Sequence, residues 1–310
     1  MVTGLLLERG ANIVATVDRD PALAGSLLSD LVSAAPPCTI AASVDDLQVE
    51  ADAAIVTTRS SLAECADDFR ALLERGLAVV SSCEELIYPW QRQAALAQTL
   101  DDCARAHGGR LLGTGVNPGY LMDAFALATT AVCTQVRGVY IERIQDATTR
   151  RVPFQRKIGA TMEPAALEAA VSAGTMGHVG LLESVQFLAA GLGVDIDRTE
   201  QDTSAVIAER ATPSGVGDIA AGSARGIRQT ARAYAGDDLV IELVFHAAVA
   251  EGRNIDRIKL DSDPPVGVTW QNGVHGDVAT TAILVNAVDS LLAAAPGLHT
   301  MMTIPPARVR

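Results

Sequence analysis

The sequence predicts an α/β protein whose two parts are built differently. In the first third of the 310 residues, short apolar strands alternate with amphipathic helices, an order that gives a parallel, doubly wound sheet. From about Val136 long alternating strands follow one another with few helices between them, which predicts an open, mostly antiparallel sheet with one covered face. A content of 49% hydrophobic and 20% charged residues is typical of a globular chain.

The elements of the first part follow from hydrophobic periodicity and from proline and glycine at their ends. Strands are expected at residues 11–17, 38–43, 51–58, 77–82 and 110–115, and helices at 21–34, 61–76 and 89–109. The strand at 51–58 is almost continuously apolar, as in a parallel sheet buried on both faces. This order predicts a Rossmann-type sheet.

The second part is expected to hold long strands at residues 136–147, 203–210, 217–235, 238–250 and 257–263, with helices at 163–174, 179–193 and 276–297. We therefore predict three regions. Residues 1–135 form a dinucleotide-binding domain, residues 136–275 form a substrate and dimerisation domain, and residues 276–310 form a C-terminal helix and tail that packs back near the domain junction.

The chain begins as if inside a dinucleotide-binding unit. Gly10 closes a short apolar helix, the strand 11–17 follows, and Asp18 comes directly after it. In such a unit a first strand and a glycine-rich phosphate loop stand before the helix. We therefore expect that both are missing here, that Met1 is an internal methionine, and that the complete protein starts roughly 15–25 residues upstream. In this form we expect weak cofactor binding and marginal stability.

Composition limits the partners. The net charge of −13 argues against nucleic acid and anionic membranes, which carry the same sign. No apolar run approaches the about 20 residues of a membrane span, and the sequence shows no signal peptide. The five cysteines are dispersed and odd in number, which is typical of reduced thiols in a cytoplasmic enzyme. Cys103 and His107 lie four residues apart without further ligands, so we expect no metal site.

Polar residues follow the first expected strands. Asp18 is placed to accept hydrogen bonds from the adenosine ribose, which favours NAD over NADP, although Arg19 beside it can pair with a phosphate. Alternatively, Asp18 only opens a turn. Thr57 and Thr58 end the expected strand 51–58, at the carboxyl edge of the sheet, and are candidates for cofactor contact; equally, Ser60 or Ser61 there only caps the following helix.

Two further stretches lie at carboxyl ends of strands. Glu84 and Glu85 follow the strand 77–82, where one carboxylate can exchange a proton with an amine; alternatively, both only complement a helix dipole. Residues 113–119 form a Gly-Thr-Gly turn before Asn117, which is expected to cap a helix begun by Pro118. Such a loop lets backbone and an amide approach a flat ring, but an ordinary helix cap has the same pattern.

Three basic residues stand out in the second part. Arg143 lies on an otherwise apolar strand face, so it needs an anionic partner, either a structural Asp or a substrate carboxylate. His246 ends an alternating strand, and His178 precedes a helix. A lone histidine is more often a core residue than a ligand contact, but three such groups in one domain favour a site.

Four blocks carry a resemblance to a known family: residues 113–123, 145–160, 177–189 and 276–301. Together they resemble the 2,4-diaminopentanoate dehydrogenase family and its native amine dehydrogenase relatives, which are cousins of dihydrodipicolinate reductase. The resemblance implies a dinucleotide domain, a mixed substrate domain, a homodimer and NAD or NADP as cofactor. Members of the family convert an amine to a ketone and ammonia, or run the reverse reaction. The missing first strand is the departure from the family.

The resemblance also implies roles for single residues. Glu84, with Glu85 as the fallback, engages ammonia or the imine, and the loop of Asn117, Pro118 and Gly119 lies against the nicotinamide. In members that act on amino acids or keto acids, a basic pocket holds the substrate carboxylate. The resemblance implies that this pocket is formed here by Arg143, His178 and His246. The leading hypothesis is an NAD(P)-dependent dehydrogenase of an amino or diamino acid or a simple amine. The alternatives are an imine reductase of the dihydrodipicolinate reductase type, and a catalytically silent relative without the phosphate loop.

Overall fold

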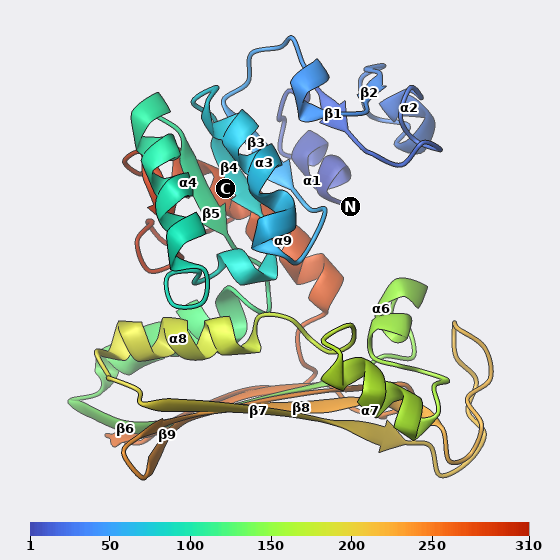
Figure 1. Ribbon diagram of the computed structural model, residues 1–310, viewed down its shortest axis with the longest axis vertical. Coiled ribbons are helices and arrows are strands. Elements are labelled where there is room, and N and C mark those ends of the chain that lie inside the picture. Colours follow the sequence, from blue (N-terminus) through green and yellow to red (C-terminus); the bar gives the residue numbers. More distant parts are fainter. Residues whose placement is uncertain (310) are drawn as a thin grey trace. The chain divides into compact units, whose positions relative to one another are not determined.

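The computed structural model describes residues 1–309, which form two compact units (Figure 1). Unit 1 comprises Met1–Tyr120 and Gly276–Arg310, and unit 2 comprises Leu121–His275. The chain therefore passes between the units twice, after Tyr120 and after His275. No helix within residues 1–309 has both the length and the apolar character that crossing a membrane requires.

Unit 1 is built on a parallel four-stranded sheet in the order β12-β5-β4-β3. Its strands are β3 (Ala53–Val56), β4 (Ala78–Ser81), β5 (Arg110–Gly113) and β12 (Gly297–His299). Helices α3 (Leu62–Leu73) and α4 (Ala94–His107) pack on one face through a core that contains Phe69 and Leu100. Helix α9 (Gly276–Leu292) packs on the other face through Leu284 and Leu291. Because both faces are covered, every residue of β4 is buried.

The first fifty residues depart from the expected elements. They form α1 (Val2–Glu8), β1 (Thr16–Val17), α2 (Leu28–Leu31), β2 (Ile40–Ala41) and η1 (Val44–Asp46). The expected strand 11–17 is reduced to two residues, which pair with β2 in a separate two-stranded sheet. The expected helix at 21–34 is wrong over most of its length. Gly25 adopts φ +87° and donates its N–H to the carbonyl of Ile40, so the chain turns before α2.

Unit 2 is built on a six-stranded sheet in the order β11-β10-β6-β9-β8-β7, in which only the β6–β9 pair is parallel. Its strands are β6 (Gln135–Asp146), β7 (Arg198–Ile207), β8 (Ala224–Ala235), β9 (Asp238–Ala248), β10 (Ile255–Asp263) and β11 (Val266–Trp270). Strand β8 begins later than expected, because Gly222 at φ +91° and the residues before it form turns. Strand β11 was not expected.

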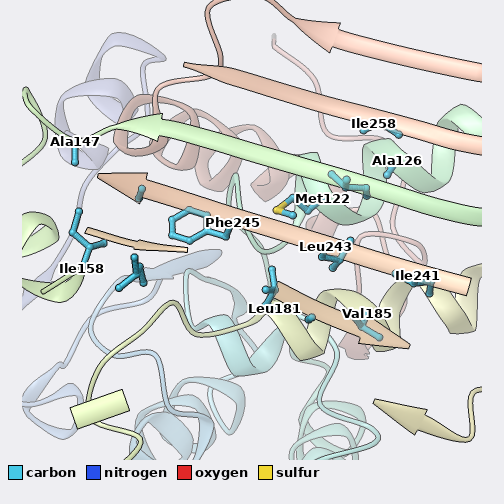
Figure 2. Packing of buried hydrophobic residues seen from close by; sticks show 14 of the residues in the cluster. Met122, Ala126, Ala147, Ile158, Leu181, Val185, Ile241, Leu243, Phe245 and Ile258 are labelled. Carbon is cyan, nitrogen blue, oxygen red and sulfur yellow. The ribbon is translucent and has the colours of Figure 1, made fainter. Parts of the chain in front are cut away.

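Helices cover one face of this sheet. They include α6 (Val152–Lys157), α7 (Pro164–Ser172) and α8 (Leu181–Leu192), and Figure 1 shows α7 and α8 on the same side of the strands. Figure 2 shows Ile241, Leu243 and Phe245 of β9 in one buried cluster with Leu181 and Val185 of α8. Segments η3 (Tyr120–Ala124), α5 (Phe125–Thr129) and η4 (Thr130–Val132) precede the sheet. The predicted fold class is confirmed.

Candidate active site

The carboxyl ends of β3, β4 and β5 carry the residues that the sequence singled out in unit 1. Thr57 and Thr58 follow β3 and are exposed, and the hydroxyl of Thr58 lies 3.8 Å from the thiol of Cys65. The helical turn η2 (Glu84–Leu86) follows β4. Parallel strands bring their carboxyl ends to one edge of the sheet, which is where ligands bind in folds of this kind.

Glu85, the second of the two adjacent glutamates, makes contacts that hold the start of a helix. One oxygen of Glu85, Oε2, accepts hydrogen bonds from the backbone N–H of Leu62 (2.8 Å) and from the side-chain amide of Gln93. Glu85 therefore caps the N-terminus of α3, where Ser61 occupies the N-cap position without a side-chain hydrogen bond. The backbone N–H of Glu85 also bonds to the carbonyl of Ser60 (3.2 Å). These bonds give Glu85 a structural role.

Glu84 is the first residue of η2 and is half-buried. Two features hold η2 at the sheet edge. The hydroxyl of Ser81 accepts the N–H of Cys83 (3.0 Å) and donates to the carbonyl of Val56 (2.9 Å). A Cβ on Gly113 would lie 2.6 Å from the carbonyl carbon of Leu86, so only glycine in β5 lets the turn pack this closely.

The loop after β5 differs from the expected helix cap. The Asn117–Pro118 peptide bond is cis, the helical segment begins at Tyr120 rather than at Pro118, and the side chain of Asn117 does not cap it. Gly119 has φ +123°, and a Cβ there would lie 2.5 Å from the nitrogen of Gly115. The loop therefore folds back on itself. Helix α9 supports it, because the hydroxyl of Thr280 accepts a hydrogen bond from the N–H of Val116 (3.2 Å).

This loop presents polar atoms without partners. Within residues 1–309, both amide atoms of Asn117 and the hydroxyl oxygen of Thr114 are buried and make no hydrogen bond. Leaving such groups unpaired costs about 1–3 kcal/mol each. An amide with a free donor and a free acceptor, beside a hydroxyl at the carboxyl edge of a parallel sheet, fits the polar groups of a dinucleotide.

Asp18 and Arg19 lie in the exposed turn after β1. Asp18 accepts the N–H of Asp20 (2.9 Å), the turn contact that the sequence suggested as the alternative to a ribose contact. Arg19 lies 2.5 Å from Asp68 of α3. The Arg19 side chain is 57% exposed, so solvent screens this ion pair and its contribution to stability is small. Both residues stay accessible, and the cofactor role of Asp18 stays a prediction.

In unit 2 the strand register places polar residues in one row across the covered face of the sheet. Asp256 of β10 pairs with Arg143 of β6, which pairs with Phe245 of β9, which pairs with Gln229 of β8. Residues in register on neighbouring strands share a face, so these four side chains project into an otherwise apolar core. The sequence analysis missed Asp256 and Gln229, although Asp256 alternates with Ile258 as Arg143 does with Ile141.

Arg143 finds its anionic partner within this row. Nη1 of Arg143 lies 3.1 Å from Oδ1 of Asp256, and both side chains are almost fully buried. Nη2 donates to the carbonyl of Val274 (2.7 Å), and the N–H of Val274 donates to Oδ2 of Asp256 (2.7 Å). Burial lowers the pKa of Arg143 to about 10, while the charge of Asp256 opposes this shift. Of the two partners left open by the sequence, the structure supplies the aspartate.

His178 lies over the same row. Its ring stacks on Phe245 with centroids 4.3 Å apart. The side chain of Gln229 accepts the N–H of His178 and donates to its carbonyl, both at 2.9 Å. Burial lowers the pKa of His178 to about 3, helped by the positive charges of Lys157 and Arg143. The imidazole is therefore neutral near pH 7, and its buried Nε2 makes no hydrogen bond within residues 1–309.

His246 lies apart from the other two basic residues. It follows Phe245 in β9, so its side chain points to the opposite face of the sheet. There its Nε2 lies 2.9 Å from Glu251, which is also 3.1 Å from Arg225. The structure thus brings Arg143 and His178 together on one face and places His246 on the other. Residues 1–309 contain no group of three or more histidine, cysteine, aspartate or glutamate side chains arranged to hold a metal ion.

This arrangement of sheets defines a two-part dehydrogenase-type fold. The structure of an amine dehydrogenase from Mycobacterium smegmatis matches with a TM-score of 0.89 at 22% identity and covers 100% of this chain and 93% of that one. A WlbA dehydrogenase from Bordetella pertussis, solved with NADH and UDP-GlcNAcA, matches with a TM-score of 0.52 at 14% identity over 94% of this chain and 84% of that one.

The chain belongs to the 2,4-diaminopentanoate dehydrogenase family, because the model of that family's C-terminal domain matches residues 120–309. A 2,4-diaminopentanoate dehydrogenase from Acetoanaerobium sticklandii is 28% identical over 98% of this chain and 89% of its own length. An amine dehydrogenase from Streptomyces virginiae is 24% identical over 64% of this chain and 61% of its own length. The predicted family resemblance is confirmed.

Proposed function

We propose that this chain is an NAD(P)-dependent oxidoreductase that interconverts an amine with the corresponding ketone and ammonia. The observation that carries this proposal is the family match over residues 120–309, together with a relative named 2,4-diaminopentanoate dehydrogenase that aligns with 98% of the chain. The unpartnered polar atoms at the carboxyl edge of the unit 1 sheet support it, since they match a polar ligand there.

The proposed cofactor site uses the carboxyl edge of unit 1. Asn117, with Pro118 and Gly119, holds the nicotinamide end, Thr57 and Thr58 line the same edge, and Asp18 accepts the ribose hydroxyls. Asp18 favours NAD over NADP, because a 2′-phosphate would be repelled by its carboxylate. A bound nicotinamide supplies the hydride acceptor for amine oxidation and the hydride donor for the reverse reaction.

Glu84 is the proposed acid–base residue. An ammonium group cannot lose hydride from its carbon until its nitrogen has a free lone pair, so a base must first remove a proton. A carboxylate at the sheet edge accepts this proton and returns one when water adds to the imine carbon. Glu85 is less suited to this role, because its Oε2 is committed to Leu62 and Gln93.

The test is amine-dependent NADH or NADPH formation followed at 340 nm, with variants Glu84→Gln and Glu85→Gln in parallel. Glu84→Gln is expected to lower kcat by about 10²–10⁴-fold while cofactor binding, measured by fluorescence titration, stays unchanged. Full activity of Glu84→Gln would remove the residue from the mechanism. Failure of every amine, together with reduction of a preformed imine without ammonia, would favour the imine reductase alternative.

We also propose a homodimer. The face of the six-stranded sheet opposite the helices carries charges of both signs, such as the exposed Arg137–Asp261 pair, beside an open hollow of about 410 Å³. A surface with both signs of charge can match its own copy across a two-fold axis. Light scattering coupled to size-exclusion chromatography measures the mass directly. The cytoplasmic location stays a prediction from cysteine usage.

A further inference from the structure

Two cysteines of unit 1 lie in contact beneath the sheet edge that carries Glu84. Cys65 lies near the start of α3, and Cys83 lies directly before η2. Both belong to one buried cluster, with exposures of 1% and 0%, and their side chains share a hydrogen bond. Neither is in a disulfide. Two reduced thiols that are distant in the sequence are therefore brought together by the fold.

The segment before α3 holds both sulfur atoms. Sγ of Cys83 donates to the carbonyl of Ser60 (3.2 Å), and Sγ of Cys65 donates to the carbonyl of Arg59 (3.7 Å). Because these two carbonyls belong to consecutive residues, both thiols are fixed on one short stretch of backbone. The hydroxyl of Thr58 lies 3.8 Å from Sγ of Cys65, and Thr58 is exposed. The sulfur of Cys65 thus lies one side chain below the surface.

The two thiols differ in acidity. The hydrogen bond from Cys83 lowers the pKa of Cys65 from 9.0 to about 7, against the effect of burial, and Thr58 adds to the lowering. The same hydrogen bond and burial raise the pKa of Cys83. Near pH 7 the pair therefore holds a thiolate on Cys65 beside a neutral thiol on Cys83. A reactive thiolate next to a second cysteine is the arrangement found at redox-sensitive sites.

We propose that Cys65 and Cys83 form a modification site, which a peroxide oxidises to an intramolecular disulfide. The Cys65 thiolate attacks one oxygen of hydrogen peroxide, the O–O bond breaks, and hydroxide leaves, which gives a sulfenic acid on Cys65. The sulfur of Cys83 then attacks the sulfur of Cys65, the S–O bond breaks, and the oxygen leaves as water with the proton of Cys83. Two thiols and one peroxide thus give one disulfide and two waters, and two electrons pass from sulfur to oxygen.

The disulfide would act on the neighbouring glutamate. A disulfide bond is about 2.05 Å long, shorter than any contact between two thiols, so Cys83 must move toward α3 and leave the carbonyl of Ser60. The N–H of Cys83 is bound to Ser81, and η2 packs closely on Gly113, so this movement displaces the turn. Glu84 is the next residue along the chain. The expected loss of turnover rests on the proposed function of Glu84, whereas formation of the disulfide does not.

The first test uses the unmodified full chain. Hydrogen peroxide is added, free thiols are titrated under denaturing conditions, and linked peptides are identified by mass spectrometry. We expect the loss of two thiols, a cross-link between the peptides of Cys65 and Cys83, and recovery with dithiothreitol. The rate should fall about fivefold from pH 7 to pH 6, as the thiolate fraction of a group with a pKa of about 7 does. Oxidation confined to Cys38, Cys103 and Cys133, or no loss of thiols, would overturn the proposal.

Cys83→Ser separates the two steps of the reaction. Without the second thiol, the sulfenic acid on Cys65 should persist, so dimedone should label Cys65 at least about tenfold more than in the wild type. Cys103→Ser is the control, because Cys103 lies half-buried on α4, and it should form the cross-link as the wild type does. Equal dimedone labelling of the wild type and Cys83→Ser would refute the role of Cys83, and the wild-type mapping decides if the variant does not fold.

Turnover gives the last readout. In the oxidised wild type kcat should be lower by about tenfold or more, since a displacement of about 1 Å at a reacting group has an effect of this size, and dithiothreitol should restore it. A complete disulfide with unchanged kcat would overturn the link to Glu84. The absence of turnover with every amine, together with a mapped disulfide, would instead count against the proposed function and leave the modification site standing.

Discussion

Replacing Glu85 tests whether the structure separates the two adjacent glutamates. Glu85→Ala removes the acceptor for the Leu62 N–H at the start of α3 and leaves the amide of Gln93 without its carboxylate. Loss of a helix cap costs about 1 kcal/mol, and loss of a hydrogen bond to a charged group costs about 1.5–3 kcal/mol. Because Glu85 is half-buried and water replaces part of these bonds, we expect a net destabilisation of about 2 kcal/mol.

The assay is thermal unfolding followed by circular dichroism, alongside kcat for the same protein. For a domain of about 150–250 residues, 2 kcal/mol corresponds to a fall in Tm of about 4–8 °C. Glu85→Gln, which keeps an oxygen acceptor for Leu62, should recover about half of this loss. Glu84→Gln should differ by a loss of kcat much larger than that of Glu85→Gln. A Glu85→Ala protein with wild-type Tm and no activity would refute the reasoning.

Three further predictions concern packing and protonation. Gly113→Ala should lower stability by about 1–3 kcal/mol and reduce kcat, because the added Cβ would lie 2.6 Å from Leu86 and displace η2; normal Tm and kcat would contradict the contact. Gln229→Leu removes both bonds to the backbone of His178, so amide exchange at residues 174–180 should rise at least tenfold, with no change expected in unit 1. In an NMR titration the ring of His178 should stay neutral until about pH 3, since burial lowers its pKa from 6.5. The folded state then binds fewer protons than the unfolded chain, so this residue's contribution is present above pH 6.5 and declines as pH falls from 6.5 toward 3; titration near pH 6.5 would contradict it.

The contribution of the sequence is clearest where periodicity is strong. The helices α3 and α4 and the long strands β6 and β9 lie where apolar spacing predicted them, because a helix or strand buries one face whatever its neighbours are. The same argument placed Arg143 on an apolar strand face. Apolar periodicity did not predict β12, a strand of three residues that pairs with β5. A segment so short is a strand only because β5 supplies its hydrogen bonds.

The sequence by itself determined the two-part α/β class, the family resemblance and the set of residues to consider. Tertiary structure decided the contacts of these residues. Glu85 accepts a hydrogen bond at the start of α3, Asp256 forms an ion pair with Arg143, and His246 lies on the opposite face of the sheet from His178. These outcomes depend on contacts between residues far apart in the sequence: Leu62 and Glu85 are 23 residues apart, and Arg143 and Asp256 more than a hundred. They also depend on the strand register, which decides the face of the sheet on which each side chain lies. Composition and local spacing carry no information about such distant partners, so only the folded chain settles what each polar side chain can still bind.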